Sequence, residues 1–357
     1  MADAALGRAR LVAQGLVTRL FDSPRDAAGA FGAHQGQDLP GVVASLALRC
    51  GGDVDAVVAA FARGEIVRGY PMRGTVFAMA AQDAAWITQL CVGPGLRQSV
   101  RLLDKRGLGE RHRARSEEVA RELLAAGPRP RAELGERWAE AGLSEAQGAN
   151  YHLLVHLIST GVLCHGPIVD GDQHVALCES WLPEGSGLEG RFNGDREAAA
   201  AELLSRYLTS RGPATLRDFQ WWSKLPIAEI RRAFEQIRDR FEEVDEERFQ
   251  RQGLADEVRE AGRSASRPLL LPGFDEFILG YQDRLFAMTQ DVHERLVPGN
   301  NGMFRRPAIS GGRVVGTWKR GGTPSRRRFE LEELAPVPDR TRTGLAACYD
   351  SFPFLGG

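Results

Sequence analysis

The sequence predicts a mainly α-helical protein with a small β content, an α+β fold of three tandem winged-helix motifs followed by a C-terminal β-barrel-like sheet. Three observations lead to this prediction. Apolar residues recur at helical spacing through most of residues 1–265. Groups of such helices are followed by two short β-like runs joined by a turn, which is the layout of a winged helix. From about residue 266 onward, alternating runs joined by Gly-Gly pairs are typical of a small antiparallel sheet or barrel.

The first motif is expected over residues 1–95. Ser23-Pro24 resembles an N-cap followed by proline at the first helical position, and Asp38 is expected to cap the next helix. The turn at 71–74 contains proline and glycine, so it predicts a hairpin. The expected elements are helices at 4–20, 24–33, 39–49 and 53–63, and β-runs at 66–70 and 75–79.

The same layout recurs twice at a spacing of roughly 90 to 100 residues. The second motif (96–190) has expected helices at 116–126, 130–141 and 144–160 and a hairpin at 163–168 and 174–178. The third motif (191–265) has expected helices at 195–209, 215–222 and 226–238, with β-runs at 241–244 and 249–254. The last region (266–357) has expected strands at 308–310, 313–318 and 328–331 and a helical tail at 335–354. The alternative is a helical protein with hairpins that are not true repeats.

The amino-acid composition limits which binding partners and which cellular compartment we expect for this protein. The net charge of -1 means that any DNA-binding surface must be a local patch. Only three of the 46 basic residues are lysine, namely Lys105, Lys224 and Lys319. Amine nucleophiles are therefore few, whereas planar guanidinium groups, which bind phosphate through two hydrogen bonds, are plentiful. A GC-rich genome also explains this bias. Five cysteines without a CxxC pair disfavour zinc and disulfides. With no signal peptide or membrane span in the sequence, we expect a cytoplasmic protein.

The common catalytic and cofactor motifs are absent. The sequence contains no Walker loop, no HExxH and no GxGxxG or GxSxG in a strand–turn–helix context. His152 and His156 stand at i and i+4 on a predicted helix, but no third ligand follows nearby, so a hydrogen-bonded or solvated helix face is favoured over a metal site. We therefore expect neither a metal nor a cofactor.

A turn between two helices of the first motif carries Gln35-Gly36-Gln37-Asp38. If this turn is extended, residues two apart point the same way, so Gln35 and Gln37 present two amides to one side. Each amide both donates and accepts hydrogen bonds, so the pair is suited to hold and aim a water molecule. A simple polar turn explains the same residues, and Asp38 is interpreted as the helix N-cap rather than as a base.

The stretch from Asn301 to Glu330 is strongly basic. Its basic residues are interleaved with glycine, Phe304 and Trp318, a combination suited to phosphate contact and base-step insertion, although a solvated sheet face explains it too. A second basic run at 97–115 is either a linker beside the DNA backbone or an exposed helix, and Trp221-Trp222 is expected in the core. The basic residues of the first stretch are Arg305, Arg306, Arg313, Lys319, Arg320, Arg326, Arg327 and Arg328.

Four segments together resemble a known family. They are Gln35-Gly36-Gln37-Asp38, the stretch 68–75 (RGYPMRGT), the stretch 271–284 (LPGFDEFILGYQDR) and the stretch 314–320 (VVGTWKR). In this order and spacing, and over nearly the whole chain, the sequence resembles the AlkZ/YcaQ-like winged-helix DNA glycosylases, the helix-turn-helix 42 superfamily. Glutamine at both ends of the turn is more similar to the AlkZ-like branch. Gly36 is a departure, because the family has an apolar residue at this position.

The resemblance implies three winged-helix motifs arranged as a C, a β-barrel and DNA in the concave face. It also implies that Gln35 and Gln37 are catalytic. We expect a monofunctional enzyme that removes bulky N7-alkylguanine adducts, with interstrand crosslinks as possible substrates, and that gives self-resistance to a genotoxic natural product. The alternative is a non-catalytic winged-helix DNA-binding protein, either a regulator or a lesion-sequestering protein; a helical protein-binding scaffold is a third option.

The expected partner is double-stranded DNA carrying alkylated guanine, bound by a monomer without a membrane or an obligate protein partner. Residues of the first wing lie close in sequence to the Gln turn, although a structural hairpin turn explains them equally well. The residues expected to contact DNA are His34, Arg68, Met72, Arg73, Arg305, Arg306, Trp318, Lys319, Arg320 and Arg326.

Overall fold

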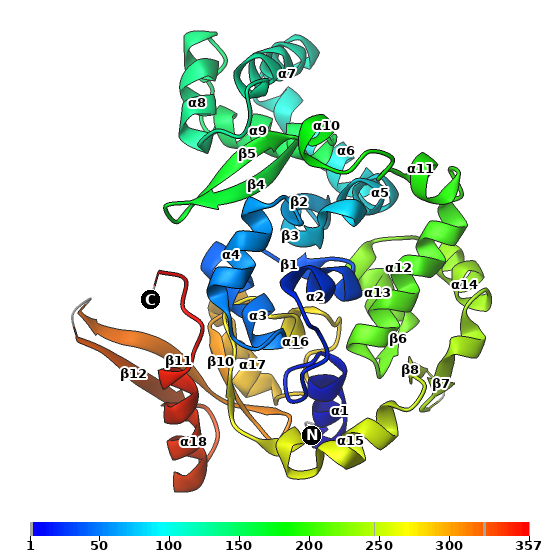
Figure 1. Cartoon of the computed structure of the whole chain (residues 1–357), viewed down its shortest axis with the longest axis vertical. Coiled ribbons are helices and arrows are strands. Elements are labelled where there is room, and N and C mark those ends of the chain that lie inside the picture. Colours follow the sequence, from blue (N-terminus) through cyan, green and yellow to red (C-terminus); the bar gives the residue numbers. More distant parts are fainter. Residues whose placement is uncertain (1–2, 246, 301, 324–325, 357) are drawn as a thin grey trace.

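The computed structural model describes residues 3–245, 247–300, 302–323 and 326–356. Asn301, the first residue of the basic stretch, lies outside these ranges. The predicted fold class is confirmed: helices dominate, two-stranded hairpins follow three groups of helices, and a curled antiparallel sheet completes the C-terminal part. Figure 1 shows these parts curving around the central sheet, with the hairpins β4–β5 and β11–β12 projecting on the same side of the molecule.

The first group of helices agrees with the predicted one except at its start. The helix α1 ends at Ala13, seven residues before the predicted end, because the chain turns at Gly15 with a φ of 70°. Ser23 caps α2 through its side chain, as expected, whereas Asp38 occupies the N-cap position of α3 without making a side-chain cap bond. The elements are α1 (Ala4–Ala13), α2 (Pro24–Phe31), β1 (His34–Gln35), α3 (Leu39–Arg49), α4 (Val54–Ala62), β2 (Ile66–Met72) and β3 (Thr75–Ala80).

The second group contains three helices that the sequence did not predict, α5, α10 and α11, and it decides between the two alternatives given for the basic run at 97–115. The helix α6 carries the first part of the basic run at 97–115, and α7 begins within its second part, so this run is helical rather than a linker. The elements are α5 (Ala81–Cys91), α6 (Gly93–Lys105), α7 (Glu110–Leu124), α8 (Arg131–Glu140), α9 (Ala149–Ser159), β4 (Leu163–Val169), β5 (Asp172–Leu177), α10 (Cys178–Trp181) and α11 (Leu188–Phe192).

The first two hairpins form one continuous sheet with the Gln turn at its edge. Its strand order is β1-β3-β2-β4-β5. Gln35 pairs with Phe77 across β1 and β3, and Arg68 pairs with His165 across β2 and β4. The sheet therefore joins residues on both sides of the predicted boundary at 95/96. The four-part division of the chain stays a prediction.

The remaining elements form the third group and the C-terminal sheet. The third group has the sheet order β6-β8-β7, and the C-terminal sheet has the order β12-β11-β10-β9. The elements are α12 (Arg196–Arg211), β6 (Ala214–Thr215), α13 (Leu216–Ser223), α14 (Ile227–Glu235), β7 (Phe241–Glu243), β8 (Arg248–Arg251), α15 (Leu254–Ala261), β9 (Leu269–Leu270), α16 (Glu276–Leu279), α17 (Gln290–Leu296), β10 (Arg306–Ser310), β11 (Arg313–Thr323), β12 (Arg326–Glu333) and α18 (Asp339–Asp350). Short 3₁₀ turns lie at Arg238–Arg240, Gly262–Ser266 and Pro298–Asn300.

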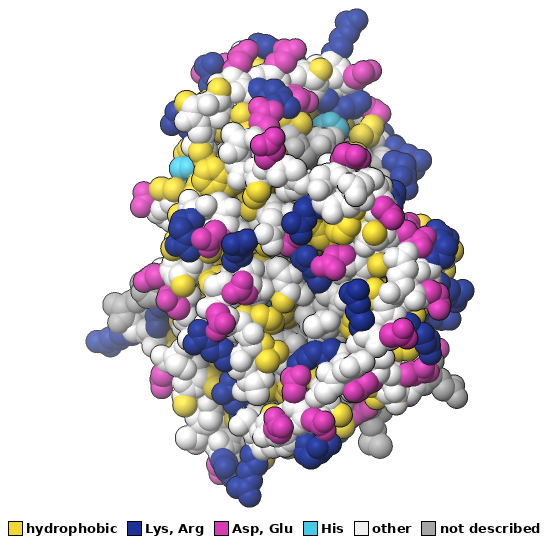
Figure 2. All heavy atoms as spheres, turned by 45° about the vertical axis from the view of Figure 1, so that its right-hand side comes forward, with side chains coloured by type: hydrophobic (Ala, Val, Ile, Leu, Met, Phe, Trp, Pro, Cys, Tyr) yellow, Lys and Arg dark blue, Asp and Glu magenta, His cyan; other side chains and the backbone are white. Residues whose placement is uncertain are grey.

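One large hydrophobic cluster holds distant parts of the chain together. It runs from Leu6 in α1 through Trp222 in α13 and Tyr281 to Leu334 after β12. Within the described ranges, no helix is both long and apolar enough to cross a bilayer. Figure 2 shows basic and acidic side chains interspersed over the face that it presents, in keeping with the net charge of -1.

Candidate active site

The backbone of the Gln turn lies directly against β3. The amide of Gly36 donates to the carbonyl of Val76 at 2.9 Å, which extends the pairing of β1 with β3 by one residue. A Cβ atom at Gly36 would lie 3.0 Å from the Ala78 nitrogen and 3.1 Å from the Phe77 carbonyl carbon. Glycine therefore permits this close approach, and any larger residue there has to move the turn away from β3.

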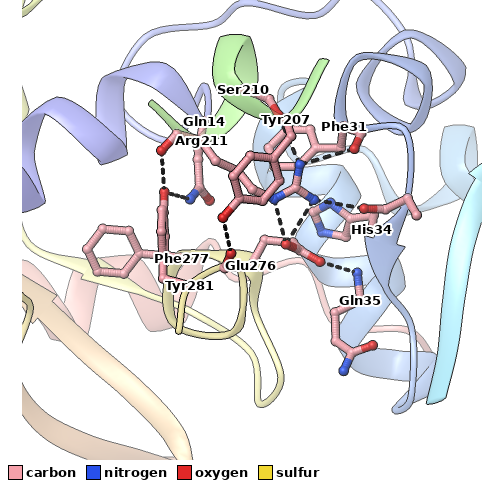
Figure 3. Close-up of polar contacts among 12 residues, drawn as sticks. Gln14, Phe31, His34, Gln35, Tyr207, Ser210, Arg211, Glu276, Phe277 and Tyr281 are labelled. Atoms are coloured by element: carbon pink, nitrogen blue, oxygen red, sulfur yellow. Dashed lines mark hydrogen bonds and ion pairs between the residues drawn. The ribbon is translucent and has the colours of Figure 1, made fainter. Parts of the chain in front are cut away.

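A buried carboxylate holds the other side of the turn. The amide of Gln35 donates to Glu276 Oε1 at 2.6 Å, and Arg211 of α12 donates to Glu276 Oε2 at 2.9 Å. Arg211 also donates to the carbonyls of Phe31 and Ala33, just before the turn. Figure 3 shows this arrangement, with the side-chain amide of Gln35 directed away from Glu276. Three segments far apart in the sequence thus fix one backbone position.

A second buried ion pair holds His34. Arg49 donates through both terminal nitrogens to Asp275, at 2.9 and 3.0 Å, and Ser45 donates to the same carboxylate. His34 Nε2 lies 2.8 Å from Ser45 Oγ, and His34 is fully buried. Burial, with the nearby Arg49 charge, holds the pKa of His34 well below its usual value, while Arg49 lowers the pKa of Asp275 despite that group's burial. His34 is therefore neutral and internal.

Arg68 connects the turn with the second wing. Its Nε and Nη2 donate to the Gly36 carbonyl at 2.9 and 2.5 Å, and its Nη1 donates to Gln173 of β5. Burial lowers the pKa of Arg68 to about 10. Arg68 uses its guanidinium to hold the turn, so the turn is fixed by Glu276 on one side and by Arg68 on the other.

The two glutamine side chains differ in exposure. Gln35 is 4% exposed, and its Oε1 accepts a 3.2 Å hydrogen bond from the amide of Gly36. Its Nε2 makes no hydrogen bond among the described residues and is not sealed from solvent. Gln37 is exposed and lines two cavities. The side-chain amide of Gln37 is thus exposed, whereas only the amide nitrogen of Gln35 is left without a hydrogen bond among the described residues.

The larger cavity brings Gln37 together with the basic stretch. It has a volume of about 910 Å³ and is walled by the Gln turn, the segment after β9 and the strands β10 to β12. Two of its basic side chains are ion-paired, Lys319 with Glu330 at 3.0 Å and Arg305 with Glu332 at 2.8 Å. Its lining residues are Gln37, Asp38, Gly273, Phe274, Met303, Phe304, Arg305, Arg306, Thr317, Trp318, Lys319, Glu330, Leu331 and Glu332.

A polar cavity of about 400 Å³ lies on the opposite flank of Gln37, between the first two wings. His165 lines it, and burial lowers the pKa of this imidazole to about 3, with a further contribution from Arg68. Its Nδ1 has no hydrogen-bonding partner among the described residues. Tyr70, Arg131 and Tyr151 share the wall. Gln37 therefore separates two spaces of different composition.

The residues expected to contact DNA fall into two groups. His34, Met72 and Trp318 are buried, and the indole nitrogen of Trp318 donates to the Leu271 carbonyl at 2.8 Å. The positions of these three favour roles in supporting neighbours rather than in touching a duplex. In contrast, Arg305, Lys319 and Arg326 are exposed, and Arg73, Arg306 and Arg320 are partly buried.

Sequence reasoning missed the residues that position the turn. Asp275 and Glu276 stood out only through the resemblance, yet two adjacent acids inside the apolar run LPGFDEFIL signal buried, paired charges. Arg211 gave no local signal. The prediction that both Trp221 and Trp222 lie in the core is correct only for Trp222, since Trp221 is half-buried. Among the described residues, no three His, Cys, Asp or Glu side chains are grouped so as to hold a metal ion.

The chain is similar to known DNA repair proteins. A family model described as DNA glycosylase AlkZ-like matches residues 28–352. An interstrand DNA cross-link repair glycosylase from Streptomyces sahachiroi is 29% identical over 164 residues, which are 44% of this chain and 43% of that protein. The matched segment thus spans less than half of that relative. The solved structure of the S. sahachiroi DNA glycosylase AlkZ superimposes with a TM-score of 0.75 and 21% identity over 99% of this chain and 97% of that one, which shows a shared fold.

The first prediction concerns the buried carboxylate behind the turn. Glu276→Gln leaves Arg211 as an unpaired buried charge, so we expect the free energy of unfolding to fall by about 3 kcal/mol. The matched control is Glu197→Gln, whose ion pair with Arg232 is exposed and is expected to contribute less than about 1 kcal/mol. Chemical denaturation of both variants measures the difference. Equal losses in the two variants would contradict an anchoring role for Glu276.

The second prediction concerns acid sensitivity. His165 stays neutral in the folded protein down to about pH 3, whereas an unfolded histidine has a pKa of about 6.5. Below pH 6.5 the unfolded chain therefore binds the extra proton, so the contribution of His165 is present above that pH and is lost as the pH falls. Between pH 7 and pH 5, we expect the free energy of unfolding to fall by about 2 kcal/mol less in His165→Gln than in the wild type. The exposed His112→Gln variant is the control, and an unchanged loss in His165→Gln would show that His165 is not the titrating group.

Proposed function

The chain belongs to the AlkZ-like DNA glycosylase family, and on this premise we propose that it hydrolyses the N-glycosidic bond of bulky N7-alkylguanine adducts in DNA. We include interstrand crosslinks among the substrates, because the Streptomyces relative is named for cross-link repair. We further propose that the protein acts as a monomer in the cytoplasm and protects its host from a genotoxic natural product. The observation that carries the proposal is the rigidly held Gln turn, which lines a large cavity together with basic and acidic residues of the C-terminal sheet.

The chemistry requires little acid catalysis. Alkylation at N7 makes the guanine cationic, so the base leaves easily. What the enzyme must supply is stabilisation of an oxocarbenium-like sugar and a water molecule aimed at C1′. Fixed amide dipoles meet both needs, since preorganised polar groups stabilise developing charge without reorganising. Positioning of the water alone contributes several kcal/mol.

We assign these tasks to Gln37 and Gln35. The amide oxygen of Gln37 accepts a hydrogen bond from the water and directs its dipole toward the sugar. As the C1′–O bond forms and the C1′–N9 bond breaks, the purine leaves neutral and the proton of the water passes to solvent. The free Nε2 of Gln35 donates to the same water from behind. Asp38 lines the cavity beside Gln37 and makes no side-chain hydrogen bond or ion pair among the described residues. Its negative charge favours a cationic lesion and sugar in this cavity.

The cavity suits a bulky lesion better than a flipped base. Its volume of about 910 Å³ is lined by five segments, and two of its aromatic residues, Phe274 and Phe304, pack against each other with ring centroids 5.8 Å apart. They therefore do not form a slot that sandwiches one base. We infer that the adduct enters the cavity while the guanine stays close to the duplex.

The C-terminal sheet supplies contacts to the DNA backbone. A neighbouring cavity of about 370 Å³ is lined by Arg306, Lys319, Arg320 and Arg327 and by the first turn of α3. Among the described residues that line it there is no carboxylate, and the N-terminus of α3 adds a positive dipole end, so the cavity is suited to phosphate. We propose that Arg305, Arg306, Lys319, Arg320 and Arg326 contact phosphates, and that His34, Arg68, Met72 and Trp318 position the residues that do.

The third prediction tests the catalytic pair. Gln37→Ala removes the open amide, so we expect single-turnover release of N7-alkylguanine to fall about 100-fold or more while duplex binding persists. Gln35→Ala combined with Gln37→Ala is expected to abolish release. The control is Gln290→Ala, an exposed glutamine on α17. Excision by the double variant at the wild-type rate would show that the assignment is wrong.

The fourth prediction concerns the product. Lys319 lines the cavity of Gln37, but its ammonium is ion-paired with Glu330. We expect hydrolysis to leave an abasic site, with strand breaks appearing only after alkali and no enzyme trapped on DNA by borohydride. Excision reactions run with and without borohydride distinguish the outcomes. A trapped covalent complex that disappears in Lys319→Gln would instead indicate a lyase.

A further inference from the structure

Three cationic side chains gather around the half-buried ring of Trp221 on α13. The guanidinium carbon of Arg73 lies 4.5 Å from the ring centroid, that of Arg284 lies 5.3 Å away, and the Lys224 ammonium lies 5.6 Å away. The three residues come from the β2–β3 turn, the end of α13 and the segment after α16. We call Arg73, Lys224, Arg284 and Trp221 the Trp221 cluster.

The charges of the Trp221 cluster have no counter-ion. Within the described part of the chain, none of its three cations makes an ion pair or a side-chain hydrogen bond, and Arg73 Nη1 and Arg284 Nε are sealed from solvent without a partner. Glu276 is the acid within range of Arg73, but it already holds Arg211 and the Gln35 amide. Elsewhere, the fully buried arginines Arg49 and Arg211 each bind a carboxylate, and the buried Arg68 donates to the Gly36 carbonyl and to Gln173.

Backbone strain is concentrated in the same place. Five residues other than glycine have a left-handed φ, and two of them, Asp170 and Asn193, are of the types that adopt it readily. The other three are Arg73 (φ 57°), Lys224 (φ 62°) and Phe274 (φ 64°). Such strain costs on the order of 1 kcal/mol at each position and persists where a side chain is needed in that place. Two of these three are cations of the Trp221 cluster.

The Trp221 cluster adjoins the candidate active site on two sides. Arg73 also lies over the ring of Phe77, which pairs with Gln35 across β1 and β3. Arg284 lies over Phe304, whose ring lines the cavity of Gln37. Phe77 therefore connects the cluster with Gln35, and Phe304 connects it with the cavity that Gln37 lines.

We propose that Arg73, Lys224 and Arg284 bind one phosphodiester group of the DNA strand that carries the lesion. The proposal rests on the proposed function, since DNA has to be the substrate. A phosphate fits because it supplies negative charge and accepts hydrogen bonds from the Lys224 ammonium and from the guanidinium nitrogens of Arg73 and Arg284 that are not sealed from solvent. A base stacked on Trp221 fits less well, because the cations already lie over the ring. Binding of that phosphate would hold the sugar-phosphate backbone so that the sugar of the lesion lies beside the Gln turn.

The salt dependence of duplex binding tests the proposal. The logarithm of the binding constant falls with the logarithm of salt concentration, with a slope of about −0.9 for each neutralised phosphate. We expect Lys224→Gln combined with Arg284→Gln to reduce the magnitude of this slope by about 1 and to weaken binding about tenfold at low salt. Arg137→Gln combined with Arg259→Gln removes two exposed, ion-paired charges elsewhere and is the matched control. Thermal unfolding checks that each variant is folded, and the exposed Lys224→Gln alone is the fallback if the double variant is not.

Neutral methylphosphonate links placed one at a time around an N7-alkylguanine locate the contact. For the wild-type protein, we expect that a methylphosphonate at one position close to the lesion weakens duplex binding about tenfold. For the double variant, the methylphosphonate at that position is expected to cause no further loss of affinity, because the effects of removing two partners of one contact are not additive. An unchanged salt slope, or full additivity at every position, would overturn the Trp221 proposal. A wild type that fails to release N7-alkylguanine would instead overturn the proposed function, which separates the two failures.

Discussion

The carboxylate of Glu276 is the constraint on which the candidate site depends. It accepts the Gln35 amide, binds Arg211 of α12, and has no exposure to solvent. A buried ion pair of this kind gives little net stability compared with a hydrophobic pair, but removing either partner leaves an uncompensated charge. The cost of breaking it enforces one geometry. Here that geometry joins the first motif, the third motif and the C-terminal region at the backbone of the Gln turn.

The rest of the site repeats this principle. Asp275 with Arg49 fixes His34 on one side of Gln35, and Arg68 fixes the Gly36 carbonyl on the other. The terminal nitrogens of Arg49 and all three guanidinium nitrogens of Arg68 are engaged by acceptors, so these groups do not serve a ligand as well. The arginines of the C-terminal sheet and of the Trp221 cluster differ in that many lack acidic partners within the described residues. The buried ion pairs of Arg49 and Arg211 thus set geometry, whereas the surface carries both ion-paired side chains, such as Lys319, and arginines that make no ion pair among the described residues.

Local features were predictable from the sequence, and long-range pairings were not. Ser23 capped its helix and the turn at Arg73-Gly74 closed a hairpin, because both depend on a few neighbouring residues. The position of the Gln turn followed from the same local pattern, and the resemblance named its residues. However, Gln35 and Glu276 are 241 residues apart, and no periodicity encodes that contact. The exposure of His34, Met72 and Trp318 was overestimated for a related reason: residue type indicates what a side chain can bind, whereas tertiary packing decides whether it reaches solvent.

The low pKa values of the buried histidines agree with the proposal that neutral amides are the catalytic groups. Beside several arginines, His34 and His165 stay neutral, so neither imidazole is a ready proton donor. That would be a defect for a glycosylase acting on a neutral purine, whose departure needs protonation. It is no defect when the base is already cationic, because stabilising the sugar and aiming the water are then the remaining tasks. A rigid backbone with two amides and a nearby unpaired Asp38 meets those tasks, and a positively charged acid catalyst in the same space would repel the lesion that the enzyme must accept.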